Sequence, residues 1–161
     1  MIRFARAADH AAIAEVVEAA FGQPDEARLI ERLRAGGDVM FELVALADDE
    51  ITGHVLFSRL WADSQNLYAA LAPLAVRPGL QRTGVGSALT RASLEQAREF
   101  GAHGVIVLGH PAYYPRFGFS SETAANVKSV YAGGPAFMAV ALEPGAFDAP
   151  VSVNYPDAFS D

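Results

Sequence analysis

Cysteine is absent from the 161-residue sequence. The chain therefore has no disulfide, no thiolate metal site and no cysteine that could carry a covalent intermediate. Basic residues are also scarce, with 12 Lys and Arg against 19 Asp and Glu and a formal net charge of -7. Because binding to a phosphate backbone needs a basic face, this balance argues against a nucleic-acid partner.

Long apolar runs are missing as well. No stretch approaches the ~20 residues that a membrane helix requires, and the start, Met1-Ile-Arg-Phe4, has strand character instead of the pattern of a signal peptide. We therefore expect no membrane contact and a cytoplasmic location. The length and the 52% hydrophobic content favour one domain, residues 1–161, with a sizeable core.

Two kinds of catalytic site are excluded by the residues that are missing. No group of His, Asp and Glu shows metal-ligand spacing, so we expect no metal. The pattern Gly-x-Ser-x-Gly is absent too, which argues against a serine hydrolase of the α/β-hydrolase type.

Glycine, in contrast, is concentrated in one turn between a strand and a helix. An apolar strand ends at Val76, Pro78-Gly79 follows, and an amphipathic helix begins close to Gly84. The first amides of a helix have no carbonyl partners and lie at the positive end of its dipole, so they favour a phosphate. Gly84 and Gly86 carry no side chain that would hold a phosphate away, and Arg82 adds a positive charge.

Two familiar phosphate loops do not match this turn. A nucleoside-triphosphate loop needs Lys and then Ser or Thr after its last glycine, whereas Ser87-Ala88 follows Gly86. A dinucleotide loop needs a third glycine, where Leu89 stands, and an acidic residue after the next strand, where Leu108-Gly109 stands.

The spacing Gln81-x-x-Gly84-x-Gly86 instead resembles the acetyl-coenzyme A pyrophosphate loop of GNAT-type N-acetyltransferases. A second stretch, Val105 to Phe119, resembles the next strand, short helix and closing Tyr…Gly-Phe motif of that superfamily, in the same order. Its Tyr-Tyr-x-Arg-Phe-Gly-Phe segment is similar to that of small bacterial acetyltransferases. The resemblance covers residues 1 to about 142.

This resemblance implies a fold, a co-substrate and a set of contacts. The fold is α/β (α+β), a single GNAT-like domain with a mixed, mostly antiparallel sheet, a splayed central strand pair and helices on both faces. The co-substrate is acetyl-coenzyme A, and the acceptor is a small-molecule or peptide amine. The residues expected to bind the coenzyme are Leu74, Ala75, Val76, Gln81, Arg82, Thr83, Gly84, Val85, Gly86, Ser87, Ala88 and Phe117.

The order of elements agrees with this fold. Alternation and apolar periodicity predict helices at residues 10–21, 24–35 and 85–100, and strands at residues 2–6, 42–47, 51–61, 67–76, 105–108, 127–131, 136–142 and, as an edge strand, 151–155. Pro73 interrupts one strand and removes a ladder donor, so it predicts a bulge or an unpaired edge. In the family, the equivalent strand bulges and splays away from its neighbour, and the pantetheine arm binds there.

The absence of cysteine favours direct attack by the amine within a ternary complex. In the superfamily, a tyrosine before the closing Gly-Phe commonly gives a proton to the leaving thiolate, which implies Tyr114, with adjacent Tyr113 as the alternative. Both tyrosines are equally compatible with a packing role. For the base, four side chains stay open as candidates: His54, Asp63, His110 and Glu122. A coenzyme-binding sensor without turnover is the rival function, and a homodimer is an open alternative for the assembly.

Overall fold

The structure is built on a sheet whose strands largely follow the order of the chain, and the computed structural model describes residues 1–160. The main path of the sheet is β1-β2-β3-β4-β5-β7. On this path β4 and β5 run parallel, and all other neighbours run antiparallel. The expected mixed, mostly antiparallel sheet is therefore confirmed. Its strands are β1 (Ile2–Phe4), β2 (Val39–Ala47), β3 (Glu50–Ala62), β4 (Tyr68–Val76), β5 (Gly104–Leu108) and β7 (Phe137–Ala141).

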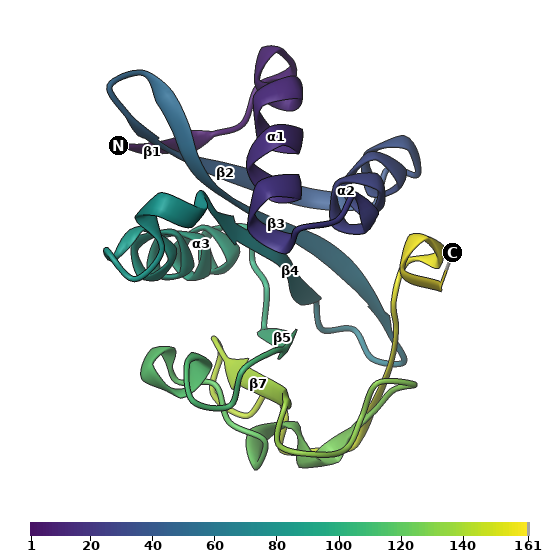
Figure 1. Cartoon of the computed structure of the whole chain (residues 1–161). Coiled ribbons are helices and arrows are strands. Elements are labelled where there is room, and N and C mark those ends of the chain that lie inside the picture. Colours follow the sequence, from purple (N-terminus) through teal and green to yellow (C-terminus); the bar gives the residue numbers. More distant parts are fainter. Residues whose placement is uncertain (161) are drawn as a thin grey trace.

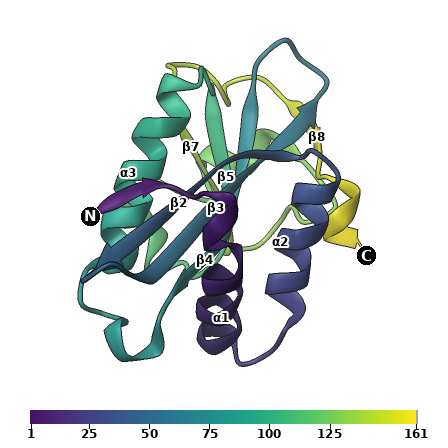
Figure 2. The ribbon, with the colours of Figure 1, turned by 90° about the horizontal axis from the view of Figure 1, so that it is seen from above.

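Helices cover both faces of the sheet, as expected. Figures 1 and 2 show α1 (His10–Phe21) and α2 (Asp25–Ala35) on one face and α3 (Val85–Glu99) on the other. Ile13 of α1 belongs to the same buried cluster as Leu56 of β3, whereas Leu89 of α3 is clustered with Val55. We call these the α1/α2 face and the α3 face. Among residues 1–160, no helix has the length and apolar character needed to cross a membrane.

Glycines end the two helices of the α1/α2 face where the sequence predicts. Gly22 has a φ of 71°, in the left-handed region, and its N–H donates to the Glu18 carbonyl at 2.8 Å. Helix α2 begins directly after Pro24 and ends before Gly36-Gly37. The short α1–α2 connection keeps the two helices side by side on the sheet.

The C-terminal part closes the molecule beside β3. Strand β8 (Val151–Asn154) pairs with β6 (Val127–Lys128) and with the end of β3, where Trp61 is in register with Asn154. The predicted edge strand is thus confirmed. The strand predicted for residues 127–131 is wrong beyond Lys128, because Ser129 accepts the Tyr131 N–H on its side-chain oxygen at 3.2 Å and the chain turns there.

Candidate active site

Strands β4 and β5 are paired over only part of their length, and we call the unpaired region between them the β4–β5 gap. The two strands pair only over Tyr68–Ala70 and Gly104–Ile106. After Ala70, no strand of residues 1–160 pairs with Leu71–Val76 on the side that faces β5. Strand β5 meanwhile pairs with β7 along its whole length, up to Leu108. The splayed central strand pair that the sequence predicted is therefore present.

A bulge bends β4 at the start of this unpaired half. On β3, Val55 and Phe57 are two residues apart, but their partners Leu74 and Leu71 are three residues apart. The extra residue falls at Ala72-Pro73, where proline has no N–H to donate. The bulge predicted from Pro73 is confirmed, and it turns β4 away from a regular ladder just where the gap begins.

The loop after β4 presents a row of free amides at the mouth of the gap. Within the described residues 1–160, none of the backbone N–H groups from Arg82 to Ser87 donates to a protein acceptor. The N–H groups of Gln81 and Ala88 donate to the carbonyls of Pro78 and Gly84, respectively. The free amides of this loop are therefore the six from Arg82 to Ser87. Such unpartnered amides at a helix N-terminus suit an anion.

Backbone conformation and two side-chain bonds hold the loop in this shape. Gly84 precedes α3 with a φ of 97°, and Arg82 has a φ of 65° although it is not glycine. The Gln81 side-chain amide donates to the Val76 carbonyl at 3.2 Å, and the Thr83 hydroxyl donates to the Leu80 carbonyl at 2.5 Å. Gln81 and Thr83 therefore fasten the loop to β4 and to its own first turn.

Gly86 brings the N-terminus of α3 against the gap. A Cβ atom added there would lie 3.1 Å from the Tyr113 hydroxyl and 3.4 Å from Val76. Tyr113 also approaches the Ser87 hydroxyl, at 3.5 Å. The β4 end, the start of α3 and Tyr113 thus meet at one point, so a side chain at residue 86 would fit only if Tyr113 shifted.

Tyr114 lies on the β5 side of the same gap. It begins the short 3-10 helix η3 (Tyr114–Phe117), and its ring packs edge-on against Phe119 at a centroid distance of 5.6 Å. The ring also lies so close to Gly109 that a Cβ there would be 2.5 Å from a ring carbon. Burial, together with neighbouring Tyr113, raises the pKa of the Tyr114 hydroxyl to about 12. The phenol therefore keeps its proton at neutral pH.

Three arginines surround the mouth of the gap. The Arg91 guanidinium lies 5.1 Å from the Phe117 ring centroid, and that of Arg116 lies 4.7 Å from the Tyr113 ring centroid. Together with Arg82, they form no ion pair within the described residues. Sequence reasoning did not single out Arg91, although it follows Ser87 by one helical turn and so lies on the same side of α3. The three unpaired guanidinium groups could add positive charge near the loop that precedes α3.

The four candidate bases differ sharply in their surroundings. His54 is fully buried in β3 on the α1/α2 face. The Asp63 carboxylate accepts the Ser152 N–H at 2.8 Å, which ties β8 to the chain after β3. His110 and Glu122 are exposed. Residues 1–160 contain no group of three or more acidic or histidine side chains arranged to hold a metal.

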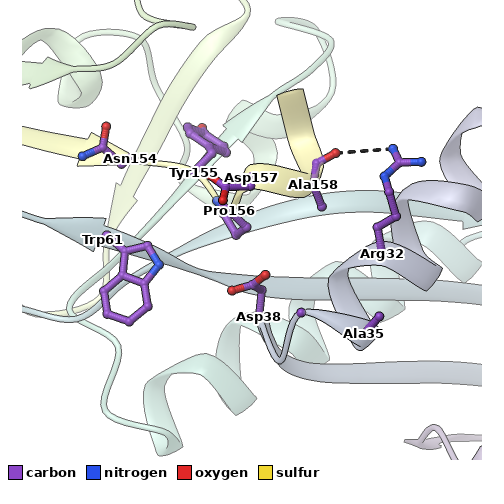
Figure 3. Close-up of a pocket in the computed structure, with 10 residues that line it drawn as sticks. Arg32, Ala35, Asp38, Trp61, Asn154, Tyr155, Pro156, Asp157 and Ala158 are labelled. Carbon is purple, nitrogen blue, oxygen red and sulfur yellow. Dashed lines mark hydrogen bonds between the residues drawn. The ribbon is translucent and has the colours of Figure 1, made fainter. Parts of the chain in front are cut away.

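A separate cavity of about 700 Å³ lies elsewhere, where β3 changes its neighbour from β2 to β8. Figure 3 shows that α2, the end of β3 and the chain after β8 form its walls, with Asp38 between Trp61 and Arg32. Arg32 donates to the Ala158 carbonyl at 3.3 Å. None of the residues that the sequence predicted for the site lines this cavity.

Comparison with protein families gives a match over most of the chain. A family model described as the acetyltransferase (GNAT) family matches residues 9–119. The uncharacterized N-acetyltransferase YjhQ of Escherichia coli strain K12 is 40% identical over 116 residues, which are 69% of this chain and 64% of YjhQ. The uncharacterized N-acetyltransferase YhbS of the same strain is 34% identical over 128 residues, 78% of this chain and 75% of YhbS. The match to YjhQ therefore spans slightly less than two thirds of that relative.

Solved structures extend the match to the whole fold. The crystal structure of YhbS from Escherichia coli in complex with CoA superposes with a TM-score of 0.92 at 30% identity, covering 100% of this chain and 92% of that chain. A GNAT family acetyltransferase from Brucella melitensis in complex with acetyl-CoA gives a TM-score of 0.83 at 33% identity, covering 99% and 97%.

Proposed function

Because the chain belongs to the acetyltransferase (GNAT) family, we propose that it transfers the acetyl group of acetyl-coenzyme A directly to a primary amine. The observation that carries this proposal is the unpaired half of β4, Leu71–Val76, next to a loop with six free amides. An extended arm and a diphosphate need these two features side by side. The similar structures that hold CoA and acetyl-CoA support the same co-substrate.

The coenzyme contacts follow from the order of these features. We assign the diphosphate to the amides of residues 82–87 and to Arg82, with the flanking residues Gln81 and Ala88 shaping the loop. The pantetheine arm would run beside Leu74–Val76 and use backbone groups that β5 does not reach. Phe117 and Tyr113 close the opposite wall, and Arg91 and Arg116 add positive charge there.

The acetyl transfer itself forms a C–N bond and breaks the C–S bond. Since successive residues of a strand point their N–H groups to opposite sides, one amide of the Leu74-Ala75 pair is directed toward the gap and can stabilise the oxyanion. With no cysteine in the chain an acyl-cysteine cannot form, and we propose direct transfer without a covalent enzyme intermediate. Residues 1–161 would work as one domain, a proposal supported by the full-length superposition on YhbS.

Tyr114 is our candidate for assisting the leaving sulfur. A thiol has a pKa near ~8.5, well below that of Tyr114, so complete proton transfer would be uphill while the thiolate is forming. The phenol therefore acts first as a hydrogen-bond donor to the developing thiolate, and solvent can complete the protonation. Tyr113, which approaches the α3 side of the gap, is the alternative donor.

Ligand-induced thermal stabilisation tests the coenzyme assignment, with acetyl-CoA, ATP and NAD compared at equal concentration. Acetyl-CoA should raise the melting temperature, because binding at ~100 times Kd adds about 2.7 kcal/mol, whereas ATP and NAD should have no comparable effect. Equal stabilisation by ATP would contradict the pantetheine part of the proposal.

A panel of primary amines then tests catalysis. Thiol release from acetyl-CoA is measured with polyamines, free amino acids and peptides with free N-termini, and mass spectrometry locates the acetyl group. We expect acetylation of at least one amine and no acetylated protein after incubation with acetyl-CoA alone. Coenzyme binding without turnover on any amine would favour the rival function, a catalytically silent sensor.

A further inference from the structure

The cavity of about 700 Å³ where β3 changes its neighbour from β2 to β8 has walls that the protein itself holds in place. Trp61 at the end of β3 is in register with Asn154, and the Arg32 guanidinium donates to the Ala158 carbonyl at 3.3 Å. Sites for small molecules are commonly pre-formed hollows of about 300 to 1,000 Å³. This hollow, which we call the β2–β8 cavity, has the volume and the fixed walls of such a site.

The β2–β8 cavity lies away from the place of the proposed reaction. Trp61 follows Leu60, whose partner Tyr68 begins β4. The unpaired half of β4, Leu71–Val76, is the opposite part of that strand. Neither the loop residues 82–87 nor the short helix η3 contributes to the walls of the cavity. A ligand of this cavity is therefore separate from the coenzyme and from the amine that accepts the acetyl group.

Two aspartates give the cavity its charge. Asp38 comes directly before β2, and Asp157 begins the 3-10 helix η5 (Asp157–Ser160), so the two carboxylates come from distant parts of the sequence. Neither forms an ion pair within residues 1–160. Of the lining residues in this described part of the chain, Arg32 is the one cation, so two carboxylates face one guanidinium. The lining is therefore complementary to a positively charged ligand.

The Asp38 carboxylate lies against bare backbone. A Cβ atom added at Gly36 would lie 2.6 Å from Oδ2 of Asp38, so a side chain at residue 36 would displace this carboxylate. Figure 3 shows Asp38 between Trp61 and Arg32. The lack of a side chain at Gly36 thus sets where the negative charge stands in the cavity wall.

Trp61 contributes an aromatic ring to the same cavity. The side chain is about half exposed, and the Arg59 guanidinium packs on it, 4.3 Å from the ring centroid. The face of an indole attracts cations, and its large apolar surface also binds methylene groups. An aromatic ring together with two unpaired carboxylates favours an organic cation that has an apolar stem.

We propose that the β2–β8 cavity binds an aliphatic diamine, as a ligand that takes no part in acetyl transfer. One ammonium group bonds to Asp38 and the other to Asp157, and the methylene chain lies against Trp61 and Pro156, which also line the cavity. Each carboxylate then has the charged partner that it lacks within residues 1–160. Because two carboxylates are unpaired, a diamine fits better than a monoamine.

Trp61 is the only tryptophan of the sequence, so its fluorescence reports on this cavity. The probes are putrescine, which is an aliphatic diamine, the monoamine butylamine and the uncharged butanediol, each titrated without acetyl-CoA at constant ionic strength. Putrescine should change the emission saturably, butylamine should bind at least ~10-fold more weakly, and butanediol should not bind. The proposal is overturned if putrescine gives neither a saturable change in emission nor a heat of binding in calorimetry, or if butylamine or butanediol binds as tightly.

Variants that remove one charge each locate the ligand. Asp38→Asn and Asp157→Asn should each raise the Kd of putrescine at least ~10-fold, because each loses one charge-assisted hydrogen bond. Asp49→Asn is the matched control, since Asp49 is exposed in the turn between β2 and β3, at the other end of β2. It makes the same change in net charge and should leave the Kd within ~2-fold of wild type. An equal loss of affinity in Asp49→Asn would reduce the effect to overall charge and overturn the proposal.

Gly36→Ala keeps both charges and moves one of them. The new Cβ displaces the Asp38 carboxylate, so the Kd of putrescine should rise about 3-fold or more. Wild-type affinity in a folded Gly36→Ala protein, checked by thermal denaturation, would contradict the contact with Asp38 and with it the proposal. Neither acetyl-CoA nor an acceptor enters these measurements, so they decide on the β2–β8 cavity whether or not the protein acetylates amines.

Discussion

The sheet is interrupted in two places, and the two interruptions differ in what they leave unsatisfied. Between β4 and β5, half a strand has no partner on one side, and six loop amides have no acceptor within residues 1–160. Between β2 and β8 there is a cavity of about 700 Å³, yet the backbone there is bonded, with the Arg59 N–H on the Asp38 carbonyl at 3.2 Å and the Asp63 N–H on the Ser152 carbonyl at 3.1 Å. Unpaired backbone, more than empty volume, marks a place for an extended ligand.

The charges follow the same division. Near the β4–β5 gap, Arg91 and Arg116 lie over the rings of Phe117 and Tyr113, and on β2 the carboxylate of Glu42 is held by two partners. At the β2–β8 cavity, Asp38 and Asp157 have no ion-pair partner within residues 1–160, and neither is buried. The first region is arranged for an anion, whereas the carboxylates of the second are accessible to solvent, where unpaired charges cost little.

The largest expected effect comes from closing the first interruption. Gly86→Asp would place a Cβ 3.1 Å from the Tyr113 hydroxyl and a negative charge among the free amides. We expect the Kd of acetyl-CoA, measured by isothermal titration calorimetry, to rise more than ~1,000-fold. Gly79→Asp is the matched control, because a Cβ at Gly79 meets open space in the same loop, and it should cost less than ~10-fold. Equal losses in the two variants would show that charge alone, without the close approach at Gly86, explains the effect.

The second effect concerns the buried carboxylate of Glu42 on β2. Glu42 has a pKa lowered from 4.5 to about 2, so its stabilisation is fully present above pH 4.5 and is lost as the pH falls toward 2. Glu42→Gln should therefore reduce the free energy of unfolding by about 2 kcal/mol at pH 7, with a smaller difference from wild type at pH 4. Urea unfolding at the two pH values measures this.

Asp38→Asn, in the wall of the second cavity, is the comparison for Glu42→Gln. Because Asp38 has no charged partner within residues 1–160, we expect a change below ~0.5 kcal/mol at either pH. If Asp38→Asn reduced the free energy of unfolding as much as Glu42→Gln, with the same dependence on pH, the claim that only Glu42 is stabilised by ion-pair partners would be wrong.

Local signals in the sequence predicted the bulge and the loop of the first interruption, whereas the splayed strands were implied by the resemblance to the family. Pro73 predicted the bulge, and Gly84 with Gly86 predicted a loop that exposes amides, because each acts through the backbone at its own position. The fold class was predictable for the same reason, since apolar periodicity and glycine stops mark elements within a few residues.

The network of His54 and the cluster of arginines could not be predicted in this way. Glu42, His54 and Arg34 come from β2, β3 and α2, so only the sheet register and the packing of α2 bring them together. Arg91 and Arg116 likewise meet through the aromatic pair Tyr113 and Phe117. Long-range pairing of this kind leaves no trace in the local spacing of residues.

A smaller effect separates the two tyrosines at the gap. Tyr114→Phe should lower kcat about 10-fold and leave the Kd of acetyl-CoA nearly unchanged, because a thiolate is a tolerable leaving group and needs only modest assistance. Tyr113→Phe is the matched variant and should reduce kcat less than 3-fold. The opposite ranking in steady-state kinetics would move the donor role to Tyr113, next to the start of α3.

The smallest effect is expected at the second interruption, and the only tryptophan of the chain reports on it. Trp61 is about half exposed and lines the β2–β8 cavity, with the Arg59 guanidinium 4.3 Å from its ring centroid. Trp61 lies next to the start of β4, at the end of that strand opposite to its unpaired half. Acetyl-CoA should therefore shift its emission maximum by less than ~2 nm at concentrations that stabilise the protein thermally. A larger shift, absent in Gly86→Asp, would show that the two interruptions are conformationally coupled, because the coenzyme would then be sensed across the sheet.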